Sequence, residues 1–158
     1  MISSVRQDIR DWLAEVMDIE VIFANQDGPV PPRPYATVLV GSIVNPVTDH
    51  LSHPDDEEEY TQTGVRQFTV SVQVFADDAV DVLEELRSYI PTPEAINDLE
   101  GIETVCYNTS DVEDLTALSG TQYRTRASID LFFRITVVKD RTLEDGVMSE
   151  VDITSSYE

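Results

Sequence analysis

The stretch from Arg126 to Val138 constrains the fold most, because apolar and mostly polar residues alternate along its whole length. Successive side chains of a β-strand point to opposite faces, so this period of two predicts one long strand with one buried face. The opposite face combines charges of both signs with the large ring of Phe132, which suits contact with a partner better than open water. The residues expected to form the core are Ala127, Ile129, Leu131, Phe133, Ile135 and Val137.

A second long strand is predicted over Gly64–Ala76, because apolar and polar residues alternate there as well. Its core face is expected to carry Phe68, Val70, Val72 and Val74. Shorter apolar segments predict strands at residues 20–24, 35–44 and 102–108. Four prolines within residues 29–34 exclude a helix there and make this connection between two strands stiff.

Three segments have apolar residues at helical spacing. The first covers residues 4–17 and begins with the spacing of a capping box at Ser4. The second follows Asp77–Asp78, whose negative charge favours the start of a helix. The third covers residues 93–100, with Thr92 in the capping position. We therefore expect helices and strands together in one protein.

The length and composition predict a single domain over residues 1–139, followed by an acidic C-terminal arm over residues 140–158. Residues 45–62 have few apolar side chains and are expected to form a mobile acidic loop, and residues 109–120 a polar loop. If the arm forms a strand, it could be exchanged with a neighbouring copy. Three apolar residues would then share one of its faces: Val147, Val151 and Ile153.

The charge is strongly unbalanced, with 31 acidic and 10 basic residues and a formal net charge of −21. Non-specific binding to nucleic acid needs cations that neutralise phosphates, so this charge argues against such binding. Solubility or a salt-adapted host would explain it plainly, and a surface along which a polyanion slides without sticking would explain it functionally. The densest acidic run consists of Asp55, Asp56, Glu57, Glu58 and Glu59, which are expected to be exposed.

No catalytic motif is present in the sequence. His50 and His53, beside Asp49 and Asp55, could hold a metal ion, but they lack a cysteine partner and a helix to fix them. The single cysteine, Cys106, is expected to be a structural thiol within a strand and fits a reducing compartment. No apolar run is long enough to span a bilayer. We therefore expect no catalytic residue, no cofactor, no metal site and no membrane contact.

Several segments, in their order and spacing, resemble the neck and tail terminator proteins of tailed phages, in particular contractile-tailed ones. The resemblance extends over most of the chain except the acidic loop and about residues 108–120. The segments that carry it are Val21–Gln26 after the first helix, Arg33–Ala36 after the prolines, Arg66–Phe75 followed by Ala79–Leu86, Tyr123–Leu131, and Glu150–Thr154.

This resemblance implies a structural virion protein without enzymatic activity. The fold expected from it and from the elements above is α/β (α+β), with a mostly antiparallel central sheet of long strands and two main helices packed on one face. Copies would assemble in the host cytoplasm into a ring, of six subunits, at the head-proximal end of the tail. The ring would join the tail tube, and the sheath where there is one, to the connector or stopper protein, and DNA would pass through it without specific binding.

A ring needs interfaces between unlike surfaces, and the polar face of the long strand offers charges and an aromatic anchor for one. Alternatively, these charges pair along their own strand. The acidic residues at positions 55–59 are candidates for facing the channel, because fixed carboxylates repel DNA. The residues expected at the subunit interface are Arg124, Arg126, Asp130, Phe132, Arg134, Val147, Val151 and Ile153.

Two other classes of function stay open at the level of sequence. The net charge is also compatible with an acidic adaptor or inhibitor that mimics DNA and binds a basic partner. The two histidines and the excess of carboxylates are compatible with a salt-adapted or metal-dependent enzyme.

Overall fold

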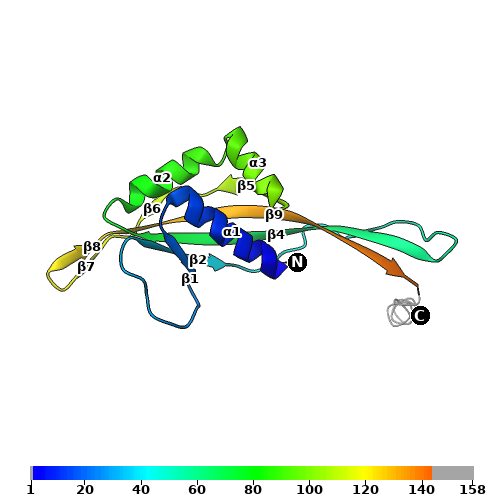
Figure 1. Ribbon diagram of the computed structural model, residues 1–158, viewed down its shortest axis with the longest axis horizontal. Coiled ribbons are helices and arrows are strands. Elements are labelled where there is room, and N and C mark those ends of the chain that lie inside the picture. The colour runs from blue at the N-terminus through cyan, green and yellow to red at the C-terminus, as the bar shows by residue number, and fades with distance from the viewer. Residues whose placement is uncertain (1, 144–158) are drawn as a thin grey trace. The chain divides into compact units, whose positions relative to one another are not determined.

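Two strands of 17 residues each, β4 (Glu59–Phe75) and β9 (Arg126–Thr142), dominate the computed structural model, which describes residues 2–143 (Figure 1). The described residues form two units, and each long strand contributes to both of them. Unit 1 comprises residues 2–44 and 67–135, and unit 2 comprises residues 45–66 and 136–143. Both long strands were predicted from their alternating residues.

The sheet has the strand order β1–β2–β4–β9–β5. Strand β1 (Glu20–Phe23) runs parallel to β2 (Tyr35–Val40), which in turn pairs antiparallel with β4. At the other edge, β5 (Thr104–Thr109) pairs antiparallel with β9. The expected α+β fold with a mostly antiparallel sheet is therefore confirmed.

In unit 1, three helices cover one face of this sheet (Figure 1). They are α1 (Ile2–Met17), α2 (Ala79–Tyr89) and α3 (Pro93–Gly101). Every second residue from Phe68 to Val74 and from Ala127 to Ile135 is buried, as predicted, whereas the residues between are only partly buried or exposed. Val137 was also predicted for the core but is only partly buried. The core includes Phe68, Val70, Val72 and Val74 of β4, Ala127, Ile129, Leu131, Phe133 and Ile135 of β9, and Ile9, Leu13, Leu83, Leu86 and Leu99 of the helices.

The helix starts differ from the sequence prediction in detail. Helix α1 already begins at Ile2, so Ser4 lies inside its first turn and the predicted capping box is wrong. Asp78 does occupy the capping position of α2, but its side chain makes no capping hydrogen bond. Thr92 caps α3 as predicted, because its hydroxyl accepts a hydrogen bond from the backbone N–H of Ala95 at 3.3 Å.

Two segments predicted to be loops contain short strands. Within residues 45–62, β3 (His50–Leu51) pairs with β4, and β4 itself starts at Glu59. The polar segment after β5 contributes β6 (Glu113–Asp114), which pairs with β9, and β7 (Ala117–Ser119), which forms a hairpin with β8 (Gln122–Arg124). Strands of two or three residues are too short to show a period of two, which is why their sequence did not predict them. Within residues 2–143, no helix has the length and apolar character required to cross a membrane.

Candidate subunit interface

The sheet face of unit 1 opposite the helices, called here the helix-free face, carries the polar side of the long strands. None of its side chains is fully buried. Large apolar groups lie among the polar ones, and Leu39 and Val105 are 47% and 52% exposed. The face consists of Tyr35, Thr37 and Leu39 of β2, Thr69, Ser71, Gln73 and Phe75 of β4, Arg126, Ser128, Asp130, Phe132 and Arg134 of β9, and Val105 of β5.

An aromatic and cationic cluster forms where β9 meets the edge strand β5. The pairing of these strands shifts between Cys106 and Asn108, which leaves Tyr107 without a partner in the ladder. The ring centroids of Tyr107 and Phe132 lie 6.3 Å apart, and the guanidinium carbon of Arg134 lies 4.7 Å from the Tyr107 centroid. This distance allows a cation–π contact, so Arg134 is held by an aromatic ring. Tyr107, 43% exposed, was not among the predicted interface residues.

Asp130, in the middle of the helix-free face, is anchored by hydroxyl groups. The Ser71 hydroxyl donates a hydrogen bond to Asp130 Oδ1 at 2.7 Å, and the backbone N–H of Asp130 donates to the Ser110 hydroxyl at 2.8 Å. Among the described residues, no ion pair joins Asp130 to Arg126 or Arg134. The charges of this face therefore do not pair along their own strand.

Three arginines line a groove of about 480 Å³ in unit 1, called here the arginine groove: Arg33, Arg124 and Arg126. Arg33 Nη2 donates a hydrogen bond to the Thr125 carbonyl at 2.6 Å, which ties the proline-rich segment to the start of β9. Arg126 Nε donates to the Leu115 carbonyl at 3.3 Å. The sequence prediction included Arg124 and Arg126 but missed Arg33, although it is the only basic residue between Arg10 and Arg66.

Aromatic and apolar side chains complete the arginine groove. Tyr35 and Phe75 lie opposite each other on β2 and β4, and their rings stack with centroids 4.8 Å apart. Val30 of the proline-rich segment lines the same groove and is 64% exposed. The β7–β8 hairpin contributes Ala117 and Arg124. The groove thus combines cationic groups with an aromatic stack.

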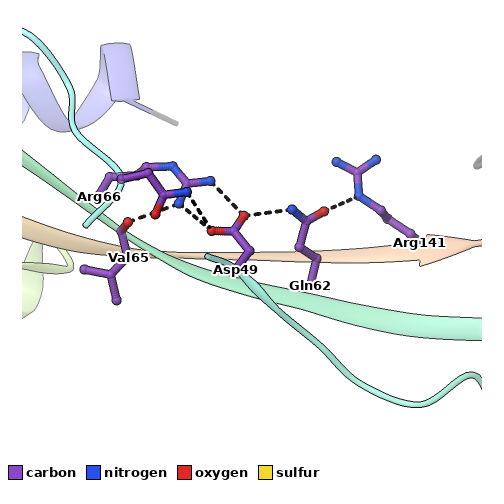
Figure 2. Close-up of polar contacts among 6 residues, drawn as sticks. Asp49, Gln62, Val65, Arg66 and Arg141 are labelled. Atoms are coloured by element: carbon purple, nitrogen blue, oxygen red, sulfur yellow. Dashed lines mark hydrogen bonds and ion pairs between the residues drawn. The ribbon is translucent and has the colours of Figure 1, made fainter. Parts of the chain in front are cut away.

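Unit 2 contains a chain of charged and polar contacts (Figure 2). Both nitrogens of the Arg66 fork bind the Asp49 carboxylate, and Gln62 Nε2 donates to Asp49 Oδ2 at 2.7 Å. Gln62 Oε1 in turn accepts a hydrogen bond from Arg141 Nε at 2.7 Å. The hydrogen bonds from Arg66, together with that from Gln62, hold the pKa of Asp49 well below its usual range. This network joins the residue just before β3 to β4 and β9 within the unit.

The metal site considered from the sequence has no support in this geometry. Asp49 is engaged by Arg66, and the Nδ1 atom of His53 lies 3.1 Å from the carbonyl oxygen of Pro54. In the part of the chain that the structure describes, no three His, Cys, Asp or Glu side chains gather in a way that could hold a metal ion.

The five predicted acidic residues, Asp55 to Glu59, form a tight turn at the start of β4, called here the acidic turn. Asp55 Oδ1 accepts hydrogen bonds from the backbone N–H groups of Glu57 and Glu59, both at 2.9 Å. The backbone N–H of Glu58 donates to the Asp55 carbonyl, and the Glu58 carbonyl accepts from the N–H of Leu143, each at 3.0 Å. All five residues are exposed. The turn therefore presents the side chains of Asp56, Glu57 and Glu58 on an ordered backbone.

Cys106 lies in β5, as predicted, and is partly buried. Burial raises the pKa of its thiol to about 11, although hydrogen bonds with the backbone partly oppose that shift. A thiol with such a pKa carries almost no thiolate at neutral pH and is a poor nucleophile.

Comparison with known proteins gives a match over nearly the whole chain. Residues 3–157 match the family described as phage neck terminator protein. No curated protein matches the chain. Among solved structures, one chain of a structure titled "Virion of native gene transfer agent (GTA) particle" is similar at 19% identity and a TM-score of 0.36, covering 85% of this chain and 92% of that one. The remaining predicted interface residues, Val147, Val151 and Ile153, lie outside the described residues.

Proposed function

Because this chain belongs to the phage neck terminator protein family and is a structural component of the virion, we propose that its copies close into a ring of six. The ring ends the tail on the side of the head and joins it to the connector. The tail tube, and the sheath where there is one, are its partners on the tail side.

The main structural support for this proposal is the composition of the helix-free face. In an isolated chain this face leaves Leu39 and Val105 about half exposed, and the partly exposed Tyr107 at its edge lies against Phe132. Aromatic groups and arginines are enriched at protein interfaces, and apolar groups at the centre of such a surface contribute most when a partner covers them. We therefore assign Phe132, Asp130 and Arg134 to the contact between neighbouring subunits.

DNA passes through the ring without specific binding. A duplex that moves past fixed cations would be slowed by contacts to its phosphates, whereas fixed carboxylates repel it. The net charge of −21 supports a channel wall that is negative on balance.

The test is assembly of the purified chain, measured by sedimentation and by negative-stain electron microscopy over a range of concentrations. The same measurements are made with tails from a terminator-deficient phage. Closed rings, in solution or at tail ends, are expected. A chain that stays monomeric and binds neither tails nor connector protein would contradict the proposal, and a pull-down that recovers a nucleic-acid enzyme instead would favour a DNA-mimicking inhibitor.

We also propose that the C-terminal arm contributes to assembly through Val147, Val151 and Ile153. Deletion of residues 146–158 should then impair ring formation or docking to the tail. Intact rings that join tails normally after this deletion would remove the arm from the interface.

A further inference from the structure

The arginine groove gathers three cations in one place, in a chain that is rich in acids. Acidic residues outnumber basic ones by 31 to 10, and Arg10, Arg66 and Arg87 each pair with a carboxylate. Within the described residues, none of the three arginines in the groove forms an ion pair. The fold thus collects three of the ten basic residues of the chain at one place, and no carboxylate of residues 2–143 pairs with them.

The chemistry of the groove suits carboxylate groups. A guanidinium group has five N–H donors in a planar fork that matches the two oxygens of a carboxylate. Arg33 and Arg126 each use a donor on a backbone carbonyl, which fixes their position and leaves other donors free for a ligand. The stacked rings of Tyr35 and Phe75 form an apolar wall beside the cations, and a ligand that covers this wall would displace water and so strengthen their attraction for an anion.

The acidic turn is the complementary surface on the same chain. Its carboxylates are consecutive and exposed, and no cation pairs with them in the described part of the chain. Like charges so close together repel one another, and binding to cations relieves that repulsion. Because hydrogen bonds already order the turn, little conformational entropy would be lost when it binds.

In a ring, the arginine groove of one copy could contact the acidic turn of its neighbour. Neighbouring subunits in a ring touch through two different surfaces, so each copy must carry both halves of the contact. Opposite charges on these halves would also fix the register and discourage other pairings. A nucleic acid would be a poor occupant by comparison, because the net charge of −21 repels it.

We propose that the arginine groove of one copy receives the acidic turn of the next copy in the ring. This inference rests on the proposed ring and adds a second contact to the helix-free face. It also assigns the acidic turn to a subunit contact and leaves the wall of the DNA channel to other carboxylates.

The test uses charge reversals at side chains that do not hold the backbone of the acidic turn or of the proline-rich segment. Asp56→Arg with Glu57→Arg reverses the turn but spares Asp55, whose carboxylate holds its backbone. Arg124→Glu with Arg126→Glu reverses the groove but keeps Arg33, which anchors the proline-rich segment. Each double variant should raise the concentration needed for half-maximal assembly about a hundredfold, because like charges then face each other.

Two combinations identify where the contact lies. A chain with all four reversals restores the opposite charges and should assemble again. A mixture of the two double variants should also assemble, as a ring in which they alternate, because each groove then meets a turn of opposite charge. Asp8→Arg with Glu15→Arg, at exposed positions of α1, and Arg87→Glu on α2 are controls for net charge and should assemble like the unaltered chain.

Each outcome decides the proposal. Rescue in the fourfold variant without rescue in the mixture would place the contact within one copy and overturn the proposal. Loss of assembly without rescue in either case would assign the groove to another occupant, which short DNA and an acidic peptide, added separately, would then distinguish. These results leave the ring itself standing. If the unaltered chain forms no ring in solution or on tails, the proposed function fails and this contact fails with it.

Discussion

Asp49 and Arg66 form a two-armed ion pair, with Nη1 at 2.7 Å from Oδ1 and Nη2 at 2.9 Å from Oδ2. Such a fork fixes both side chains more firmly than a single contact does. The Asp49 side chain is only 12% exposed, and the pair ties the residue just before β3 to β4. A strand as short as β3 gains little from its own ladder, so we expect this pair to set the local stability of unit 2.

The ion pair predicts a pH dependence of stability. The folded state lowers the pKa of Asp49, so the ionised carboxylate stabilises the fold fully above its unfolded pKa of about 4. This contribution is lost as the pH falls further. Urea unfolding of the unaltered chain and of Asp49→Asn should therefore differ most at pH 5–7, and the difference should shrink progressively as the pH falls below about 4 toward the lowered pKa of the folded state. An equal difference at pH 3 and pH 7 would assign the effect to packing instead of charge.

Gly64→Ala should break the same ion pair without removing either charged group. A Cβ atom at Gly64 would overlap the Asp49 carboxylate and lie 2.7 Å from Arg66 Nη1. We expect a loss of about 1–3 kcal/mol of unfolding free energy, with faster amide hydrogen exchange in β3. Gly101→Ala is the matched control, because a Cβ there meets nothing within 4 Å and should be neutral or stabilising. Equal effects at the two glycines would contradict this account.

Phe132 and Phe133 are adjacent but lie on opposite faces of β9, so they separate assembly from folding. Phe133 is 0% exposed, and its replacement by alanine should cost about 3–5 kcal/mol of stability. Phe132→Ala should cost less than half as much but weaken ring assembly, because this ring lies on the helix-free face. Thermal unfolding and sedimentation measure the two effects. A parallel loss of both in Phe132→Ala would make the face part of the core.

Arg126→Glu tests the helix-free face at the start of β9, where the arginine groove lies. The arginine lines the groove and holds the Leu115 carbonyl through Nε, so reversal should weaken assembly more than it lowers the melting temperature of the monomer. Arg126→Gln, which keeps a donor for that carbonyl, should retain the fold and lose part of the assembly. If both variants assemble normally, Arg126 is outside the interface.

The raised pKa of Cys106 predicts slow alkylation of the folded chain. With a pKa of about 11, its thiolate fraction at pH 8 is on the order of a hundredfold below that of an unfolded thiol with a pKa of about 8.5. Mass spectrometry after iodoacetamide treatment, with and without urea, measures the ratio. Equal rates in both conditions would show that the folded thiol is accessible and ionises normally.

The sequence predicted the long strands and their core because the pattern is local and repeated. Positions 127, 129, 131 and 133 are all 0–1% exposed, as their alternation requires. The helices α2 and α3 were predicted for the same reason, since a cap and an apolar stripe lie within each segment.

The groove and the ion pair of unit 2 depend on contacts between distant residues, which periodicity does not record. Arg33 reaches the Thr125 carbonyl across 92 positions, and Asp49 reaches Arg66 across 17. From the sequence, Arg33 belongs to the stiff proline connection and to a segment of the family resemblance, and Asp49 is a neighbour of two histidines; neither pattern predicts their partners. These contacts form only in the folded sheet, where β4 lies between β2 and β9 and β3 pairs with β4.

The shift in pairing between Cys106 and Asn108 has a consequence for solubility. Strand β5 is the last of its sheet, and a flat last strand would offer its free backbone groups to any other chain. A bulge twists such an edge and interrupts its row of donors and acceptors. The bulge therefore disfavours open-ended pairing of copies along this edge. Association then depends on side-chain contacts, whose charges can select a specific neighbour and limit the assembly to a finite number of copies.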